Sequence, residues 1–187
     1  KITRKNHQGI IAFIAPVELQ NIEDILPQLY EQGRTPFLLL LDRLTDVRNF
    51  GAIVRTAECA GVDAIVVTRK NFARISEDVA KTSAGALYKI PVCRSKDMVS
   101  TVKFLQQSGI HVMAVSEKTE RLYYDVDLTI PIALIMGSEE KGVSAALLKE
   151  ADTALKIPLA GTIESLNVSV AAGIVLYEVL QQRGMDQ

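Results

Sequence analysis

The sequence predicts an α/β fold with a mostly parallel sheet flanked by helices. Five apolar runs have the length of strands, and helix-like segments lie between them. The runs are apolar throughout and do not alternate, as expected for strands that are covered on both faces. In chain order they are Phe37–Leu41, 64–67, His111–Val115, Ile132–Met136 and 154–157.

The helices are expected where turn and capping residues frame the segments between strands. The segment 51–60 ends at Gly61, and 97–107 stops at Ser108 and Gly109, because glycine suits a helix C-terminus. An extra strand over 9–17 is expected to come first. The remaining helices are predicted over Ile22–Glu31, 143–150 and Val168–Arg183.

The composition favours one globular domain. The chain has 187 residues, 48% of them hydrophobic and 23% charged, which is enough to bury a core without disulfides. Cys59 and Cys93 lie far apart and form no CxxC pair, so we expect reduced thiols in a cytoplasmic protein. No apolar run approaches the ~20 residues of a membrane span. The chain starts at Lys1 and not at Met, which suggests a piece of something longer.

The charge is neutral overall and basic in one region. The net charge is −1, but residues 43–96 hold ten basic and five acidic side chains. This local excess fits either a polyanion-binding face or a scattered solvated surface. Charge alone does not decide between them.

Three polar loops follow predicted strands: 42–51, 137–142 and 158–167. In open α/β sheets, ligands bind beyond the carboxyl ends of strands, so these loops predict a site. Familiar motifs are missing from them. There is no GxGxxG and no GxSxG, the loop 137–142 lacks the Lys-Ser or Lys-Thr of a P-loop, and the only histidines are His7 and His111. The sequence therefore favours no dinucleotide, triphosphate, serine-hydrolase or transition-metal site, and we expect His111 to be a structural histidine.

Several polar residues in these loops have two readings. Asn49 is suited to cap or turn the chain before a helix, and Arg55 is suited to a phosphate or to a surface pair with Glu58 or Asp46. Ser165 or Asn167 is expected to cap the apolar helix that follows. That helix is apolar on nearly every side, which predicts either complete burial or packing on a partner subunit.

Together, the loops resemble the three motifs of the SpoU (TrmH-type) RNA ribose 2′-O-methyltransferases. The stretches that carry the resemblance are 49–57 (NFGAIVRTA), 135–142 (IMGSEEKG) and 157–171 (IPLAGTIESLNVSVA). Residues 6–12 further resemble the junction in the bacterial branch that modifies a guanosine of large-subunit (23S) ribosomal RNA. The resemblance implies that 1–187 is the catalytic domain and that 1–8 joins it to a preceding RNA-binding domain.

The resemblance also implies S-adenosylmethionine (SAM) as cofactor without a metal, a deep C-terminal trefoil knot (the SPOUT fold) and a homodimer that completes the active site. The implied catalytic residues are Arg55, Asn49, Glu139, Ser165 and Asn167. The implied cofactor-binding residues are Gly137, Ile157, Leu166, Met136, Pro158 and Ser165. The implied RNA contacts are Arg48, Lys81 and Ser83. Three alternatives remain: a tRNA substrate, a non-catalytic RNA-binding or ribosome assembly module, and an unrelated nucleotide-binding enzyme.

Overall fold

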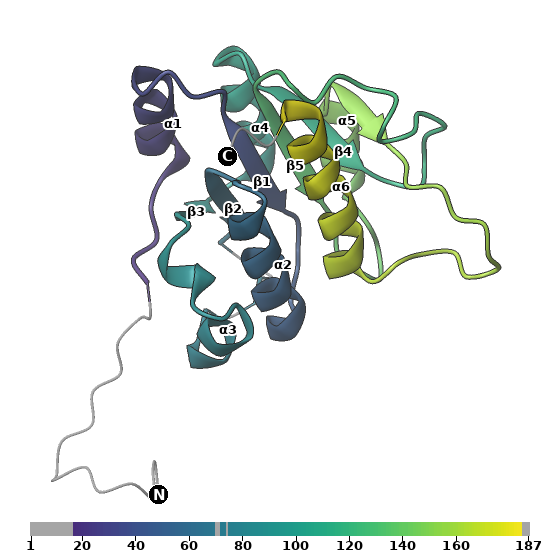
Figure 1. The fold of residues 1–187 in the computed structure, drawn as a ribbon, viewed down its shortest axis with the longest axis horizontal. Helices are drawn as coiled ribbons and strands as arrows, with labels where there is room; N and C mark the ends of the chain where they lie inside the picture. Colours follow the sequence, from purple (N-terminus) through teal and green to yellow (C-terminus); the bar gives the residue numbers. More distant parts are fainter. Residues whose placement is uncertain (1–16, 70–71, 74, 185–187) are drawn as a thin grey trace, which may run out of the picture.

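A computed structural model describes residues 17–69, 72–73 and 75–184 of the chain (Figure 1). Its centre is a six-stranded, fully parallel sheet in the order β3-β2-β1-β5-β4-β6. The strands are β1 Phe37–Leu41, β2 Ala64–Thr68, β3 Val92–Ser95, β4 His111–Val115, β5 Ile132–Met136 and β6 Thr153–Leu155. Because all six run the same way, every loop that follows a strand emerges at one edge of the sheet.

Helices cover both faces of the sheet. The helices are α1 Ile22–Glu31, α2 Val47–Cys59, α3 Glu77–Thr82, α4 Met98–Gln107, α5 Ala145–Glu150 and α6 Val168–Arg183, with a 3₁₀ turn at Ala86–Tyr88. Alternate residues of β1 enter two cores: Leu39 and Leu41 pack with α2, α3 and α6, while Leu38 and Leu40 pack with α1, α4 and α5. Figure 1 shows α2 and α6 side by side in front of the sheet. The predicted α/β class with a parallel sheet is confirmed.

Most predicted elements are confirmed, with some shifted boundaries. The strand expected over 154–157 is Thr153–Leu155, and the helix expected over 143–150 begins at Ala145. The largest shift, at the start of α2, has a physical reason. Helix α2 begins at Val47 and not at 51, because the Asp46 carboxylate accepts a hydrogen bond from the Asn49 amide at 2.7 Å and caps the helix there. Asn49 therefore lies in the first turn and is not the cap. Strand β3, helix α3 and the 3₁₀ turn were not predicted. The expected strand over 9–17 and the junction over 1–8 lie outside the described residues, except for Val17.

The two cysteines are free thiols, as predicted. Cys59 is exposed, whereas Cys93 is buried in β3. Burial raises the pKa of Cys93 to about 12, and the carboxylates of Glu23 and Asp24 add to the effect. That thiol is therefore protonated and unreactive at neutral pH. No helix in the described part of the chain is long and apolar enough to cross a membrane.

Arg183, the last residue of α6, fastens this helix to the amino edge of the sheet. Its guanidinium donates to the carbonyls of Leu128 (3.1 Å), Thr35 (2.9 Å), Pro36 (3.3 Å) and Ile130 (2.7 Å). It also lies over the Phe37 ring, 5.2 Å from the centroid. One side chain thus satisfies carbonyls from the segments that precede β1 and β5.

Arg183→Ala should lower the free energy of unfolding by about 3 kcal/mol, because it leaves four carbonyls without their charged donor, in two part-buried and two exposed hydrogen bonds. Urea denaturation followed by circular dichroism measures this loss. Arg121→Ala removes an exposed arginine that forms no ion pair among the described residues, so it should change stability by less than about 0.5 kcal/mol. Equal stabilities of the two variants would contradict the anchoring role.

Candidate active site

Three loops meet at the carboxyl edge of the sheet and are joined by one carboxylate. Glu139 Oε1 accepts a hydrogen bond from Asn49 Nδ2 at 2.7 Å and a second from Asn167 Nδ2, also at 2.7 Å. Asn167 Nδ2 lies 3.1 Å from Asn49 Oδ1, which completes the triangle. Each member comes from a different one of the three polar loops. We call Asn49, Glu139 and Asn167 the amide–carboxylate cluster.

The loop after β5 is a tight turn that only glycine permits at its first position. Ser138 and Gly142 exchange backbone hydrogen bonds of 3.2 and 2.8 Å, and Gly142 has a φ of +59°. A Cβ on Gly137 would lie 1.9 Å from the Gly142 carbonyl carbon and 2.1 Å from the Val143 nitrogen. Gly137 therefore allows two backbone segments to approach closely.

The β1–α2 loop holds this turn from the other side. Arg43 has a φ of +57°, a conformation that is uncommon for a residue with a side chain. With its backbone in this conformation, Arg43 donates a hydrogen bond from its guanidinium to the Gly142 carbonyl at 3.2 Å. Buried Asp42 accepts a hydrogen bond from the Ser144 amide at 2.8 Å. These bonds fix the turn that carries Glu139 relative to the loop that carries Asn49.

The polar residues before α6 have two roles, as the sequence suggested. Asn167 Oδ1 accepts from the Ser169 amide at 3.0 Å and from the Ser169 hydroxyl at 2.6 Å, so Asn167 caps α6. Its Nδ2 serves the amide–carboxylate cluster at the same time. Ser165 is not a cap and lines a cavity.

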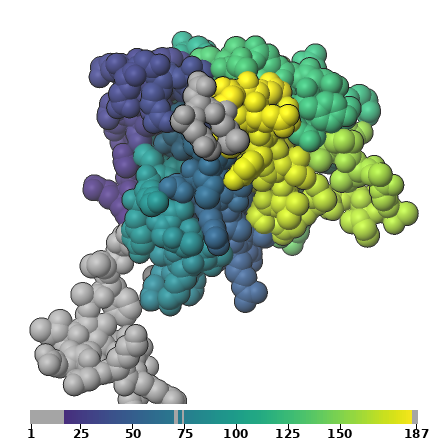
Figure 2. Space-filling view, viewed as in Figure 1, coloured from purple at the N-terminus to yellow at the C-terminus, as the bar shows by residue number. Residues whose placement is uncertain are grey.

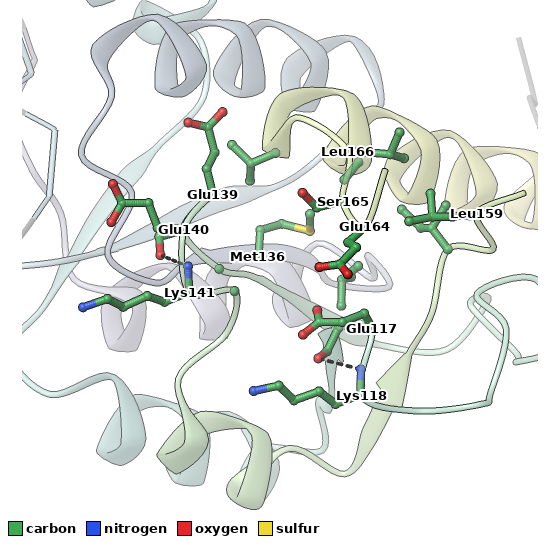
Figure 3. Close-up of a pocket in the computed structure, with 18 residues that line it drawn as sticks. Glu117, Lys118, Met136, Glu139, Glu140, Lys141, Leu159, Glu164, Ser165 and Leu166 are labelled. Carbon is green, nitrogen blue, oxygen red and sulfur yellow. Dashed lines mark hydrogen bonds between the residues drawn. The ribbon is translucent and has the colours of Figure 1, made fainter. Parts of the chain in front are cut away.

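This cavity has a volume of about 610 Å³ and lies beyond the carboxyl ends of β4, β5 and β6 (Figure 3). Residues from the predicted site that line it are Met136, Gly137, Glu139, Ile157, Ser165 and Leu166. Pro158 is exposed and is not among the lining residues. The size suits a ligand larger than a few atoms, since small-molecule pockets measure about 300–1,000 Å³.

One wall of the cavity was missed by the sequence analysis. Val115, Ser116, Glu117 and Lys118 line it from the end of β4. Their signal was present in the sequence, because Ser116-Glu117-Lys118 is a polar run directly after a predicted strand. The rule that identified the other three loops applies equally to this one.

Three predicted residues, Arg55, Arg48 and Lys81, form no hydrogen bond or ion pair with the amide–carboxylate cluster in the described part of the chain. Arg55 is exposed on α2 and forms no ion pair within the described part of the chain, since Glu58 pairs with Lys89 at 3.2 Å and Asp46 caps α2. Arg48 is also exposed on α2. Exposed Lys81 pairs with Glu77 at 2.9 Å.

The prediction that Ser83 contacts RNA is wrong for this structure. Its side chain is fully buried, its hydroxyl donates to the Ala80 carbonyl at 3.1 Å, and it accepts from the Leu87 amide at 3.3 Å. The hydroxyl therefore fastens the turn after α3 and is not available to a ligand. His111 has the structural role expected of it, because its Nε2 lies 2.9 Å from Thr153 Oγ1 between neighbouring strands.

Comparisons with known proteins agree with this geometry. Residues 36–177 match the SpoU rRNA Methylase family. The 23S rRNA (guanosine-2′-O-)-methyltransferase RlmB of Photorhabdus laumondii is 39% identical over 177 residues, covering 95% of this chain and 72% of that protein. An uncharacterized tRNA/rRNA methyltransferase of Synechocystis, slr0955, is 38% identical to this chain. The match covers 97% of this chain and 47% of that protein.

A solved structure gives the same result. The AdoMet-bound rRNA methyltransferase from Sinorhizobium meliloti has a TM-score of 0.79 and 29% sequence identity, over 88% of this chain and 61% of that one. This chain therefore spans less than two thirds of that protein, and about half of the Synechocystis relative. The sequence motifs, the parallel sheet and these likenesses agree, and the chain belongs to the SpoU rRNA methylase family.

Proposed function

We propose that this chain transfers a methyl group from SAM to the ribose 2′-hydroxyl of a guanosine in 23S ribosomal RNA, in the cytoplasm. The observation that carries the proposal is the amide–carboxylate cluster, which joins one side chain from each of the three family motifs beside a cavity. The rRNA target is supported by relatives that bear this activity in their names, at 37–39% identity over about 95% of this chain.

The cavity residues fit the adenosyl cofactor. Met136, Gly137, Ile157 and Leu166 offer apolar side chains and backbone groups, and Ser165 adds a hydroxyl. Such a mixture suits a nucleoside that carries a sulfonium and an amino-acid chain better than a triphosphate. Pro158 does not line the cavity, so it would act by fixing the backbone path of the loop that does. When bound, SAM supplies a methyl group on a sulfonium. The neutral thioether that remains is a good leaving group, so the proposed chemistry needs no metal.

The amide–carboxylate cluster would orient the ribose. Glu139, which lines the cavity, holds both asparagine amides in place. Among the described residues, Asn49 keeps one free N–H and one free acceptor position, whereas Asn167 is fully engaged by Glu139, Asn49 and Ser169. A ribose hydroxyl is a poor nucleophile, and it must be positioned and lose its proton as the methyl group moves. Arg55 would bind the target phosphate and favour loss of that proton, while Arg48 and Lys81 would contact RNA more remotely.

We propose further that the protein is a homodimer and that its C-terminal segment forms the deep trefoil knot of the family. Among the described residues of one chain, no hydrogen bond or ion pair joins Arg55 to the amide–carboxylate cluster, and in our proposal the second chain brings this group to the site. Val170 and Tyr177, which are 51% and 50% exposed, lie on the outer side of α6. Figure 2 shows α6, in yellow, at the surface of the molecule. Exposed apolar side chains on a largely apolar helix fit a subunit interface.

Arg55→Ala should reduce methyl transfer by about 100-fold or more while leaving the Kd for SAM within about twofold. The assay uses labelled SAM with unmodified 23S rRNA and with tRNA, and the methylated ribose is mapped. Lys149→Ala, which removes an exposed cation of α5, is the control and should keep full activity. Label only in tRNA would overturn the rRNA target. Label in neither RNA, with SAM bound, would favour a non-catalytic binding module.

Tyr177→Glu should weaken the dimer by tenfold or more, because it places a carboxylate where an apolar contact is proposed. Light scattering coupled to size-exclusion chromatography measures the mass over a dilution series. Tyr124→Glu changes a tyrosine that is 46% exposed outside α6 and should leave the mass unchanged. A monomeric wild type, or a Tyr177→Glu variant that dimerises normally, would refute this interface.

A further inference from the structure

The cavity carries an excess of negative charge that the proposed reaction does not use. Four carboxylates and two ammonium groups line it: Glu117, Glu139, Glu140, Glu164, Lys118 and Lys141 (Figure 3). Glu139 is engaged by the two asparagine amides. Within the described part of the chain, Glu117 and Glu164 form no ion pair and accept no side-chain hydrogen bond. Neither carboxylate lies within 4.0 Å of the Nζ of a described lysine, although Lys118 and Lys141 line the same cavity.

Glu117 and Glu164 come from different segments and face the same space. Glu117 follows β4, and its Oε2 lies 3.8 Å from where a Cβ on Gly142 would stand, so it reaches toward the turn after β5. Glu164 comes from the exposed segment that leads into α6. Figure 3 draws both carboxylates directed into the open space of the cavity, near Ser165 and Lys118. Both side chains are exposed, and neither caps a helix or closes a turn in the described part of the chain.

Two unpartnered carboxylates in one cavity repel each other and attract a cation. SAM carries a positive sulfonium and a positive α-ammonium against one carboxylate. Transfer of the methyl group to the ribose oxygen would leave the electron pair of the broken bond on the sulfur, as a neutral thioether, and the hydroxyl proton would pass to water. The product, S-adenosylhomocysteine (SAH), is therefore one positive charge poorer than SAM.

We propose that Glu117 and Glu164 form a carboxylate pair that makes this cavity prefer SAM to SAH, so that the product is bound less tightly than the cofactor it replaces. This inference rests on the proposed function, and it assigns the two residues that distinguish the cofactor from its product. Both carboxylates are exposed before a ligand binds, so together they contribute a modest factor, about threefold in the ratio of SAM to SAH affinities. The pair acts on binding and release and does not touch the transferred methyl group.

The test is calorimetric titration of the full chain with SAM, SAH and 5′-methylthioadenosine, which lacks the amino-acid part. The variants are Glu117→Gln, Glu164→Gln and the double substitution, which keep side-chain shape and remove charge. In the double variant, SAM should bind about tenfold more weakly and SAH about threefold more weakly, and methylthioadenosine should be unchanged. Glu31→Gln, at the far end of α1, is the matched control and should match the wild type.

The outcomes separate the inference from the function beneath it. A double variant that keeps the wild-type ratio of SAM to SAH affinities would overturn the carboxylate pair and leave the methyltransferase proposal intact. If the double variant bound all three ligands more weakly by the same factor, the carboxylate pair would also be overturned, because the substitutions would then have changed the shape of the cavity and not its charge preference. A wild type that binds none of the three would overturn the proposed function and the inference with it. If high salt weakened the preference for SAM over SAH in the wild type and left the double variant unchanged, the result would support the carboxylate pair.

Discussion

Gly137→Ala should lower the free energy of unfolding by about 3 kcal/mol or more and deform the cavity. The new Cβ would lie 1.9 Å from the Gly142 carbonyl carbon and 2.1 Å from the Val143 nitrogen. These are backbone atoms of a turn that is held by Arg43 and Asp42, so they cannot yield as the end of a flexible side chain would. Urea denaturation gives the stability, and calorimetry gives the affinity for SAM.

Gly161→Ala is the matched control. A Cβ there meets nothing within 4 Å, and the residue lies in the exposed segment before α6. We expect a change of less than about 0.5 kcal/mol and an unchanged cavity. If the two alanine variants proved equally stable, the close approach at Gly137 would not be a requirement of the fold.

Glu139→Ala should have the largest effect on the reaction. It removes the acceptor that Asn49 and Asn167 share, so both amides lose the partner that fixes their orientation beside the cavity. We expect single-turnover methyl transfer to 23S rRNA to fall by at least about 100-fold, as when a positioned polar group of an active site is removed.

Two further substitutions divide this effect into its parts. Glu139→Gln keeps an oxygen acceptor and removes the charge, so recovery of most of the activity would show that Glu139 acts by positioning. Glu140→Ala removes the neighbouring carboxylate of the same cavity, which has no partner among the described residues, and should cost less than about fivefold. Equal losses in Glu139→Ala and Glu140→Ala would mean that the amide–carboxylate cluster has no special role.

The strands that the sequence predicted best are those buried on both faces. Phe37–Leu41 and Ile132–Met136 are unbroken apolar runs, and all of their residues are buried. Strand β3 was missed because it reads Val92-Cys93-Arg94-Ser95 and lies at the end of the sheet, where Arg94 is exposed. Its pairing depends on partners elsewhere in the chain, which no local pattern records.

The sequence predicted which residues belong to the site but not which of them contact one another. The family motifs contain Asn49, Glu139 and Asn167, but the hydrogen bonds that join them span 28, 90 and 118 positions of the chain. Glu117 belongs to none of the motifs and enters the cavity only because β4 lies beside β5. The burial of Ser83 could not be read from its small, polar neighbourhood, since it results from the packing of α3 against α2.

The central place of β1 in the sheet has a consequence for how the protein is made. Leu38 pairs with Ala64 on one side, 26 positions later, and with Ala133 on the other, 95 positions later. At about 5–20 residues per second, the second partner leaves the ribosome roughly 5–20 s after β1. Throughout that interval, a strand of five consecutive large apolar residues presents an unpaired edge. Synthesis therefore passes through an aggregation-prone stage, and fast translation or a chaperone bound to the first half of the chain would raise the yield of folded protein.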